Sequence, residues 1–363
     1  MTRKEPDYIL VGAVLGLLAI GTLMVFSASS AEALQHFQNP YYYLERQLLW
    51  VALGLLAMWI MSRIDYWRLP RFALWAFGLS IVGLMMVLVP HVGLDINGAR
   101  RWVKFGPLTI QPSEAAKLAM VLMFAWLLAR HQERLHDLWH GLVPMVVMAG
   151  LVLGLVMAEP DLGTTVAIAA TFFVMLFVAG MENKHILGLG AVAIPAAAWA
   201  MFSAAYRRQR LLAFLDPWKH PLGSGFHTIQ ALLALGSGGL FGVGLGHSLQ
   251  AFGYLPEDYT DFIFAVLGEE LGLLGTLTVI ALFLVLAWRG YRAAMRAPDV
   301  FSGLLAVGLT TMIVIQAAIN IGVVTATLPV TGITLPFISY GGSSLLLSLL
   351  GIGVLMNITR HAQ

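Results

Sequence analysis

Five carboxylates fall within one stretch of the chain, LPEDYTDFIFAVLGEELG, which runs from Leu255 to Gly272. They are Glu257, Asp258, Asp261, Glu269 and Glu270. The first three stand at the end of a polar segment, and the last two lie inside an apolar run. Carboxylates at or within a membrane boundary are energetically costly, and ionisable groups there are functional candidates by default. This stretch is therefore the first place to look for chemistry.

Asp261 immediately precedes the apolar run and is the strongest candidate for catalysis. We expect it at the mouth of the membrane, where a partly desolvated carboxylate beside arginines can act as a general base. Burial would raise its pKa, and neighbouring positive charge would lower it. Glu269 lies about two helical turns deeper and is rotated by about 80° from Asp261. We therefore expect Glu269 and Glu270 to pair with polar groups on other helices.

Two clusters of basic residues offer phosphate-binding chemistry. The first holds Arg100, Arg101 and Lys104, and the second holds Arg207, Arg208 and Arg210. Arginine forks match pairs of phosphate oxygens, so these clusters could clamp a phosphate, a diphosphate or a diphosphate-linked lipid. The alternative is contact with anionic lipid headgroups.

Polar residues also open two of the apolar runs, in the segments QPSEAAK and EPDLGTT. Ser113 stands near a helix N-cap. Glu114 and Lys117 are three residues apart, so they share a helix face and form either an ion pair or the polar wall of a substrate cavity. Asp161 is placed to cap the next helix, and its turn could line the same cavity.

The segment TLPVTGITLPFISYGGSS, residues 327–344, interrupts the apolar pattern before the last run. Its prolines, Pro329 and Pro336, would break a helix. Irregular backbone at membrane depth is tolerated only where protein or a watery cavity covers it. We therefore expect this segment, with Ser343 near its end, to line the same cavity as the other polar segments.

The composition indicates that membrane helices must position these groups. Hydrophobic residues make up 59% of the chain, charged residues 11%, and mean hydropathy is +0.82. A soluble domain averages roughly 25% charged residues. The net charge of +2 does not indicate a nucleic-acid partner. The absence of cysteine excludes disulfides, thiolate metal sites and cysteine nucleophiles. The histidines lack metal-ligand spacing, and GSGGLFGVGLG lacks the Gly-Lys-Ser/Thr of a phosphate loop.

Apolar runs near the spanning length of ~20 residues predict ten transmembrane helices. We expect them at about 8–28, 47–63, 72–90, 113–130, 141–158, 163–181, 186–205, 262–288, 300–325 and 341–358. The first run has no small-residue cleavage site, so we expect a retained helix rather than a signal peptide. The chain is thus predicted to be an all-α polytopic membrane protein with a single membrane domain over residues 1–363.

Arginine and lysine predict the orientation. Short connections rich in arginine alternate with less basic ones, and the N-terminal segment falls on the basic side, so both termini are expected in the cytoplasm. The opposite, outer side carries the connections 29–46, 91–112, 206–261 and 326–340. The large extracytoplasmic loop, residues 206–261 between helices seven and eight, is rich in Trp, Phe, Leu and Gly, so we expect it to be ordered. Its stretch Phe226–Gly236 has a helical apolar pattern.

Six motifs occur in order along the chain: NGARRW…QPSEAAK, PDLGTT, YRRQR…FLDPW, LGSGG…GVGLG, YLPEDYTDFIFAVLGEELG and LPFISYGGSS. Together they resemble the SEDS proteins (RodA, FtsW, SpoVE) over essentially the whole chain. The GEELG segment and the ISYGGSS ending are more similar to FtsW or SpoVE than to RodA. The resemblance implies a ten-helix fold and peptidoglycan glycosyltransferase activity on lipid II at the cytoplasmic (inner) membrane. It also implies a role in cell division or cell shape, with a single-span class B penicillin-binding protein as partner.

The resemblance also implies roles for individual residues. The family's essential Asp in TDFIF corresponds to Asp261, its helix-four Glu and Lys to Glu114 and Lys117, and the basic residues of its large loop to Arg207 and Arg210. Arg101, Asp161 and Ser343 complete the set of expected substrate-binding residues.

The chain departs from the family pattern at three positions. Tyr259, preceded by the extra acid Asp258, stands where the family usually has His. His227 and Glu159 each stand where Gln is usual. A catalytic role for the family's His therefore does not transfer to this chain.

The predicted chemistry is glycosyl transfer in the outer cavity. Asp261 would deprotonate or orient the 4-hydroxyl of the acceptor sugar, which attacks the donor's anomeric carbon and displaces undecaprenyl diphosphate. Arg101, Arg207 and Arg210 would stabilise the diphosphate, with or without a divalent cation (Mg²⁺ or Mn²⁺). The rival is a transporter that flips lipid II, although the polar motifs gather on the outer side alone. A scaffold that only holds its partner would leave the carboxylate stretch unexplained.

Overall fold

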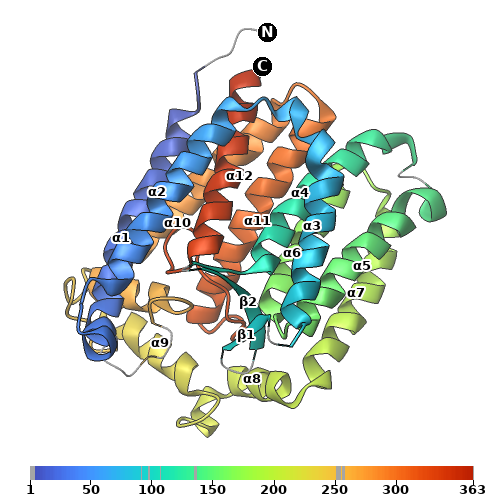
Figure 1. Cartoon of the computed structure of the whole chain (residues 1–363). Helices are drawn as coiled ribbons and strands as arrows, with labels where there is room; N and C mark the ends of the chain where they lie inside the picture. Colours follow the sequence, from blue (N-terminus) through green and yellow to red (C-terminus); the bar gives the residue numbers. More distant parts are fainter. Residues whose placement is uncertain are drawn as a thin grey trace.

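The computed structural model describes residues 5–90, 92–96, 99–106, 108–134, 137–250, 255 and 258–362. Glu257, one of the five carboxylates in the stretch singled out above, lies outside them. Long helices form a bundle with both termini at one end, while the short strands, α8 and α9 lie at the opposite end (Figure 1). We call these the terminal end and the loop end. The polar segments singled out in the sequence thus gather at the loop end.

The described residues contain nine helical segments that are long and apolar enough to cross a membrane. They are α1 (Tyr8–Phe37), α2 (Tyr42–Arg63), α3 (Pro70–Leu88), α4 (Pro112–Arg130), the π-helical turn with α5 (Leu138–Ala158), α7 (Asn183–Ser203), α10 (Ile263–Met295), α11 (Val300–Val324) and α12 (Gly342–His361). The apolar helix α6 (Leu162–Val178) is shorter, with 17 residues. These ten segments fall on the ten predicted runs, and they confirm a polytopic helical membrane protein.

Several helices extend past the predicted ends. Helix α1 continues to Phe37 and α2 begins at Tyr42, so most of the expected connection 29–46 is helical. The added residues of α1 include Ala, Glu, Leu and Gln, which favour helix although they lower the hydropathy. Helix α10 continues to Met295 and is kinked at Gly272, where φ is 66° and ψ is −164°. Hydropathy therefore locates the membrane segments but not the helix ends beyond them.

The connection between α3 and α4 contains a small antiparallel sheet that the sequence reading did not predict. Its strands are β1 (Gly93–Ile96), β2 (Ala99–Phe105) and β3 (Leu108–Ile110), in the order β1-β2-β3. Val103 of β2 pairs with Gly93 on one side and with Ile110 on the other. The Trp-Val-Lys-Phe composition of β2 suits a strand, and the sheet adds a β element to a fold expected to be all-α.

The large loop between α7 and α10 is ordered around two helices. Helix α8 (Ala205–Leu215) carries the second basic cluster, and a 3₁₀ turn (Pro217–Lys219) follows it. Helix α9 (Phe226–Ser237) confirms the helical pattern predicted for residues 226–236. The loop packs through α9 against both α10 and α11.

Helix α11 is the centre of the bundle. In its apolar window 78% of the residues are buried, and it packs against α4, α6, α10 and α12. In α7 only 6% of the corresponding window is buried, so α7 is a peripheral helix. Polar side chains on α11 are therefore in a position to contact several elements at once.

Candidate functional site

Asp261 lies at the loop end, two residues before α10, with its side chain half-buried. Its carboxylate and the guanidinium of Arg101 flank the same residue, Gly332. A Cβ built on Gly332 would lie 3.4 Å from Asp261 Oδ2 and 3.9 Å from Arg101 Nη1. The segment between α11 and α12, which was expected to line the cavity, thus runs beside the candidate base.

Arg101 is held by the turn between α5 and α6. Its Nε donates to the carbonyl of Glu159 at 3.2 Å, and its Nη2 donates to the carbonyl of Pro160. Strand β2 therefore presents Arg101 from one side while the turn fixes the plane of the guanidinium. The remaining nitrogen, Nη1, is the one nearest to Gly332.

Helix α8 brings two more arginines to the site. Arg207 donates to the carbonyl of Ala200 at 2.7 Å and to the hydroxyl of Tyr206 at 2.9 Å. The guanidiniums of Arg207 and Arg210 lie 5.4 and 5.8 Å from the centre of the Tyr206 ring. Both arginines line a pocket between α8, the α5–α6 turn and the segment before α12, together with Tyr206, Pro160 and Thr331.

Electrostatics connects Arg210 to the other charged groups. Arg210 is exposed on α8, yet the protein packed around its guanidinium lowers its pKa by desolvation, and the positive charge of Arg101 lowers it further. The charge of Asp261 and that of Tyr206 act in the opposite direction. Asp261, Arg101 and Arg210 are thus close enough to influence one another electrostatically, and Arg210 also lines the pocket beside Pro160 and Thr331.

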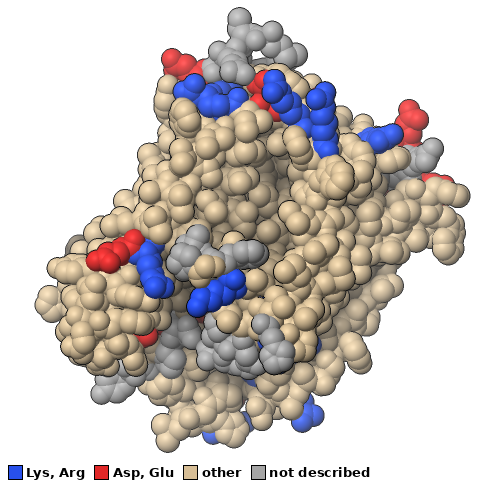
Figure 2. Space-filling model, in the orientation of Figure 1, with Lys and Arg blue, Asp and Glu red and all other residues tan. Residues whose placement is uncertain are grey.

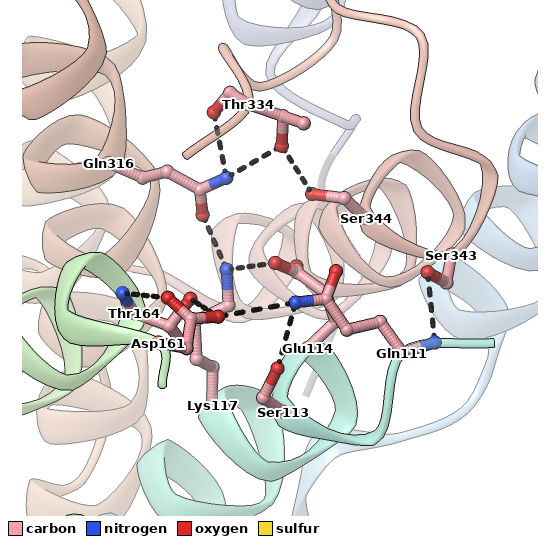
Figure 3. Close-up of polar contacts among 10 residues, drawn as sticks. All are labelled: Gln111, Ser113, Glu114, Lys117, Asp161, Thr164, Gln316, Thr334, Ser343 and Ser344. Atoms are coloured by element: carbon pink, nitrogen blue, oxygen red, sulfur yellow. Dashed lines mark hydrogen bonds and ion pairs between the residues drawn. The ribbon is translucent and has the colours of Figure 1, made fainter. Parts of the chain in front are cut away.

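The pair Glu114 and Lys117 lies inside the bundle instead of on an open wall (Figure 3). Lys117 Nζ is 2.8 Å from Glu114 Oε1 and 2.6 Å from Oε1 of Gln316 on α11. Glu114 is 5% exposed and Lys117 3% exposed. The two residues share a helix face as predicted, and the contacts make them a buried ion pair that links α4 to α11.

Asp161 and Ser343 are buried beside the ion pair and contact the residue before α4 (Figure 3). Asp161 caps α6 by accepting from the Thr164 amide at 3.0 Å and from its hydroxyl at 2.9 Å. Asp161 also accepts from the side-chain Nε2 of Gln111 at 3.3 Å, and the Ser343 hydroxyl accepts from the backbone N–H of Gln111 at 3.4 Å. The capping role is confirmed, and direct contact of these residues with substrate stays a prediction.

Comparison with known proteins places this geometry in a family. The family model described as cell cycle protein, FtsW/RodA/SpoVE, matches residues 8–363. The chain belongs to the FtsW/RodA/SpoVE family. Stage V sporulation protein E of Bacillus subtilis is 46% identical over all of both chains. The probable peptidoglycan glycosyltransferase FtsW of Trichlorobacter lovleyi is 41% identical, over 98% of this chain and 93% of the relative.

Solved structures share the fold over nearly the whole length. One is a chain from work on the structural coordination of polymerization and crosslinking by a peptidoglycan synthase complex, with a TM-score of 0.79, 33% identity and 98% of each chain covered. Another is the rod shape determining protein RodA of Thermus thermophilus, with a TM-score of 0.71 and 31% identity. That match covers 99% of this chain and 98% of RodA.

Three buried residues that lie near the site were not identified as site residues from the sequence. Glu159 is completely buried, and burial and then the charge of Asp161 raise its pKa to about 8, against the lowering effect of Arg101. Gln316 and Asn320 lie on α11, at 2% and 1% exposure. The sequence feature that could have identified Gln316 and Asn320 is their spacing: two amides four residues apart in a largely apolar helix lie on one face of it.

Glu269 and Glu270 fasten the glycine-rich part of the large loop to the beginning of α10. Glu270 accepts from the Ser27 hydroxyl of α1 at 2.7 Å and from the Gly246 amide at 3.1 Å. Glu269 accepts from the Ser248 hydroxyl and from the Leu249 amide at 3.1 Å. The prediction of a partner on another helix is confirmed for Glu270, whereas these partners of Glu269 belong to the loop.

Tyr259, at one of the departures from the family pattern, is held in an aromatic cluster. Its hydroxyl lies 3.2 Å from Glu32 Oε1 and 3.2 Å from the Tyr43 hydroxyl. Its ring also contacts that of Tyr340, 5.9 Å between centres. These contacts link the residues before α10 to α1 and α2.

An apolar groove of about 510 Å³ descends from the sheet along the bundle. Its walls include Val103 and Ile110 at the loop end, Gly83 of α3, Leu118 of α4 and Val354 of α12. The surface in Figure 2 is hollowed between α2 and α3, over α12 and α4. Because Val103 belongs to the same strand as Arg101, the groove begins next to the charged pocket.

Within the described parts of the chain, no group of three or more His, Asp or Glu is arranged to hold a metal ion. A divalent cation at this site would have Asp261 as its carboxylate ligand. It would need the oxygens of a bound diphosphate to complete its coordination, which is a common arrangement for Mg²⁺.

Proposed function

We propose that this chain is a peptidoglycan glycosyltransferase that polymerises lipid II at the outer face of the cytoplasmic membrane, for cell division or cell shape. The observation that carries the proposal is the approach of the Asp261 carboxylate and Arg101 to the same residue, Gly332, next in the chain to Thr331 of the pocket that Arg207 and Arg210 line. Relatives named as probable peptidoglycan glycosyltransferases support it.

The reaction places Asp261 next to the acceptor sugar. The carboxylate takes the proton of the 4-hydroxyl, the oxygen attacks the anomeric carbon of the donor, and undecaprenyl diphosphate leaves. Arg101 and Arg210 stabilise the charge that develops on the diphosphate, because preorganised cations in a partly desolvated pocket act strongly on such charge. A diphosphate is a good leaving group, so a positioned base and charge stabilisation suffice.

The apolar groove suits the isoprenoid chain of the same substrate. Val103 and Arg101 stand two residues apart on β2, so a lipid whose diphosphate binds Arg101 has its chain at the entrance of the groove. The lining is almost entirely apolar, as burial of a hydrocarbon chain requires. Membrane lipids would occupy the groove when no substrate is bound.

The orientation follows from the distribution of cations. Figure 2 shows a group of Lys and Arg side chains at the terminal end and further ones toward the loop end. The connections between the helices that end at the terminal end include Arg63, Arg68 and Arg71. With the arginine-rich short connections at the terminal end, the positive-inside rule supports the proposal that both termini are cytoplasmic and the site is outside. Helix α6, about 26 Å long at 1.5 Å per residue, nearly covers the hydrocarbon core and would serve as the sixth of ten spans in one membrane domain.

A partner is expected in the bilayer. Similarity to a chain of a peptidoglycan synthase complex supports a class B penicillin-binding protein that docks through transmembrane contacts. Such a partner would pair the crosslinking of peptide stems with the synthesis of the glycan by this chain.

The test is polymerisation of lipid II by purified protein, with and without the partner. Asp261→Asn keeps the shape of the side chain and removes the base, so the rate should fall by about 10²- to 10⁴-fold, the usual contribution of a general base. Asp216→Asn, a change at a carboxylate of the same loop whose side chain is 42% exposed and pairs with Lys219, should leave the rate unchanged. A wild-type rate for Asp261→Asn would remove the base assignment.

Two further arms separate the alternatives. Chelation of divalent cations tests whether a metal ion assists the diphosphate. Reconstitution in vesicles tests the rival transporter: lipid II movement across the bilayer without any glycan product would favour a flippase over the proposed enzyme.

A further inference from the structure

Three successive carbonyl groups just before α10 are each held by a donor from α11 or from the segment before α12. The donors are the Tyr340 amide to Tyr259 O (2.9 Å), the Ser339 hydroxyl to Thr260 O (2.6 Å) and the Asn320 amide to Asp261 O (2.7 Å). The backbone that carries the candidate base is thus fixed residue by residue by parts of the chain that are distant in sequence.

Asn320 makes the contact closest to the reacting group. Its Nδ2 lies 2.7 Å from the carbonyl of Asp261 and 2.7 Å from the carbonyl of Ile333. The two N–H groups of the buried Asn320 side chain therefore connect the backbone of Asp261 to that of Ile333, the residue that follows Gly332. Because the Asp261 carboxylate and Arg101 both lie close to Gly332, this amide ties the backbone of the candidate base to the segment that runs beside both groups.

Gln316 supports Asn320 from the preceding turn of α11. Its Nε2 donates to the Thr334 carbonyl at 3.0 Å, and its Oε1 accepts from Lys117 at 2.6 Å (Figure 3). One face of α11 therefore holds both Ile333 and Thr334, and it is itself held by the ion pair of α4. The buried ion pair is connected to the candidate base through this face.

We propose that Asn320 is a positioning residue that places the Asp261 carboxylate for catalysis. This inference rests on the proposed role of Asp261 as the base. Fixing the carbonyl of Asp261 fixes its Cα and the direction of its side chain, which leaves two rotatable bonds. Because a displacement of about 1 Å at a reacting group can cost about 10²-fold in rate, loss of the amide contact should act on turnover.

The chain contains a matched control at the terminal end of the bundle. Asn357 of α12 is also 1% exposed, donates to the Ser62 carbonyl at 3.1 Å and accepts from the Tyr66 amide at 3.0 Å. It is the same kind of buried amide contact between separate elements, but it is remote from Asp261. Removing it measures what the loss of such a contact does to folding alone.

The experiment compares Asn320→Leu with Asn357→Leu, because leucine has a similar size and no donor. For Asn320→Leu we expect kcat, per folded molecule, to fall by about 30- to 100-fold. Its KM for lipid II should stay within about twofold, and the acidic limb of its kcat–pH profile should move as the Asp261 environment changes. Asn357→Leu should lower Tm with kcat, KM and pH profile unchanged.

The results separate the two proposals. If Asp261→Asn is inactive and Asn320→Leu turns over at the wild-type rate, or loses activity only in proportion to its folded fraction, the positioning role is wrong. If Asp261→Asn is fully active, both the assignment of Asp261 as the base and the positioning role of Asn320 are wrong. Should Asn320→Leu not fold, Ser339→Ala removes the neighbouring bond to Thr260 O together with the bond that Ser339 accepts from the Leu335 N–H, and a wild-type kcat for that variant overturns the proposal that such bonds position Asp261.

Discussion

Glu159 gives the protein a stability that depends on pH in an unusual direction. The residue is completely buried in the turn between α5 and α6, and its pKa rises from 4.5 to about 8 because of burial and the charge of Asp161. Between these values the folded protein holds a proton that the unfolded chain has released. The free energy of unfolding therefore falls as pH rises from about 4.5 to about 8, and it levels off above that.

The size of the effect follows from the two pKa values. The span from 4.5 to about 8 corresponds to at most about 5 kcal/mol, at about 1.4 kcal/mol per pH unit. Relaxation of the turn and entry of water will reduce this upper limit. Glu159→Gln keeps the size and polarity of the protonated acid but does not titrate. The free energy of unfolding of this variant should therefore not fall in this way as pH rises.

The assay is thermal unfolding of the purified protein in detergent, from pH 5 to pH 9. The Tm of wild type and Glu159→Gln should be close at pH 5, and the variant should be several degrees more stable at pH 9. Glu133→Gln, at an exposed position of the α4–α5 connection, should follow the wild type throughout. If the two Tm curves of wild type and Glu159→Gln run parallel, Glu159 is not protonated at neutral pH and the reasoning is refuted.

Two other variants test the site and its support. Gly332→Ala puts a side chain where φ is +73°, at a cost of about 1–2 kcal/mol. The segment should therefore move away from Asp261, and the rate of polymerisation should fall about tenfold or more. A wild-type rate would mean that Gly332 does not determine the position of this segment beside Asp261. Lys117→Met leaves Glu114 buried without its cation and should destabilise by about 3–5 kcal/mol in thermal unfolding. The double variant with Glu114→Gln should recover much of the lost stability. Equal Tm values for the single and double variants would contradict the interpretation of Glu114 and Lys117 as a buried ion pair.

The membrane segments were predictable because spanning helices need long apolar runs, and each of the ten runs falls on a helix. Asp261 was predictable as a candidate because a carboxylate next to such a run is conspicuous, and Arg101 because clustered basic residues match phosphate oxygens. Their meeting beside Gly332 was foreseen only in outline, as shared lining of one cavity. Which residues touch depends on how the sheet, the α5–α6 turn and the segment before α12 pack together.

Other features carried too little local signal. The amides of Gln316 and Asn320 share a face of a largely apolar helix, but only packing reveals that Asn320 reaches Asp261. The burial of Glu159 likewise depends on how the α5–α6 turn packs against Arg101, because the residue stands next to a proline in a polar turn of the sequence. Strand β2 follows from Trp-Val-Lys-Phe only when its partners are known, because a strand is stabilised by cross-strand neighbours.

The apolar groove that starts beneath β2 has a consequence for how substrate reaches the enzyme. A lipid whose chain slides into a groove open to the bilayer arrives by diffusion within one leaflet and never passes through water. The quantity that governs encounter is then the number of substrate molecules per area of membrane, not their amount per volume of solution. Crowding of the leaflet, or other lipids that compete for the groove, would set the speed of glycan growth even when every catalytic group is in place.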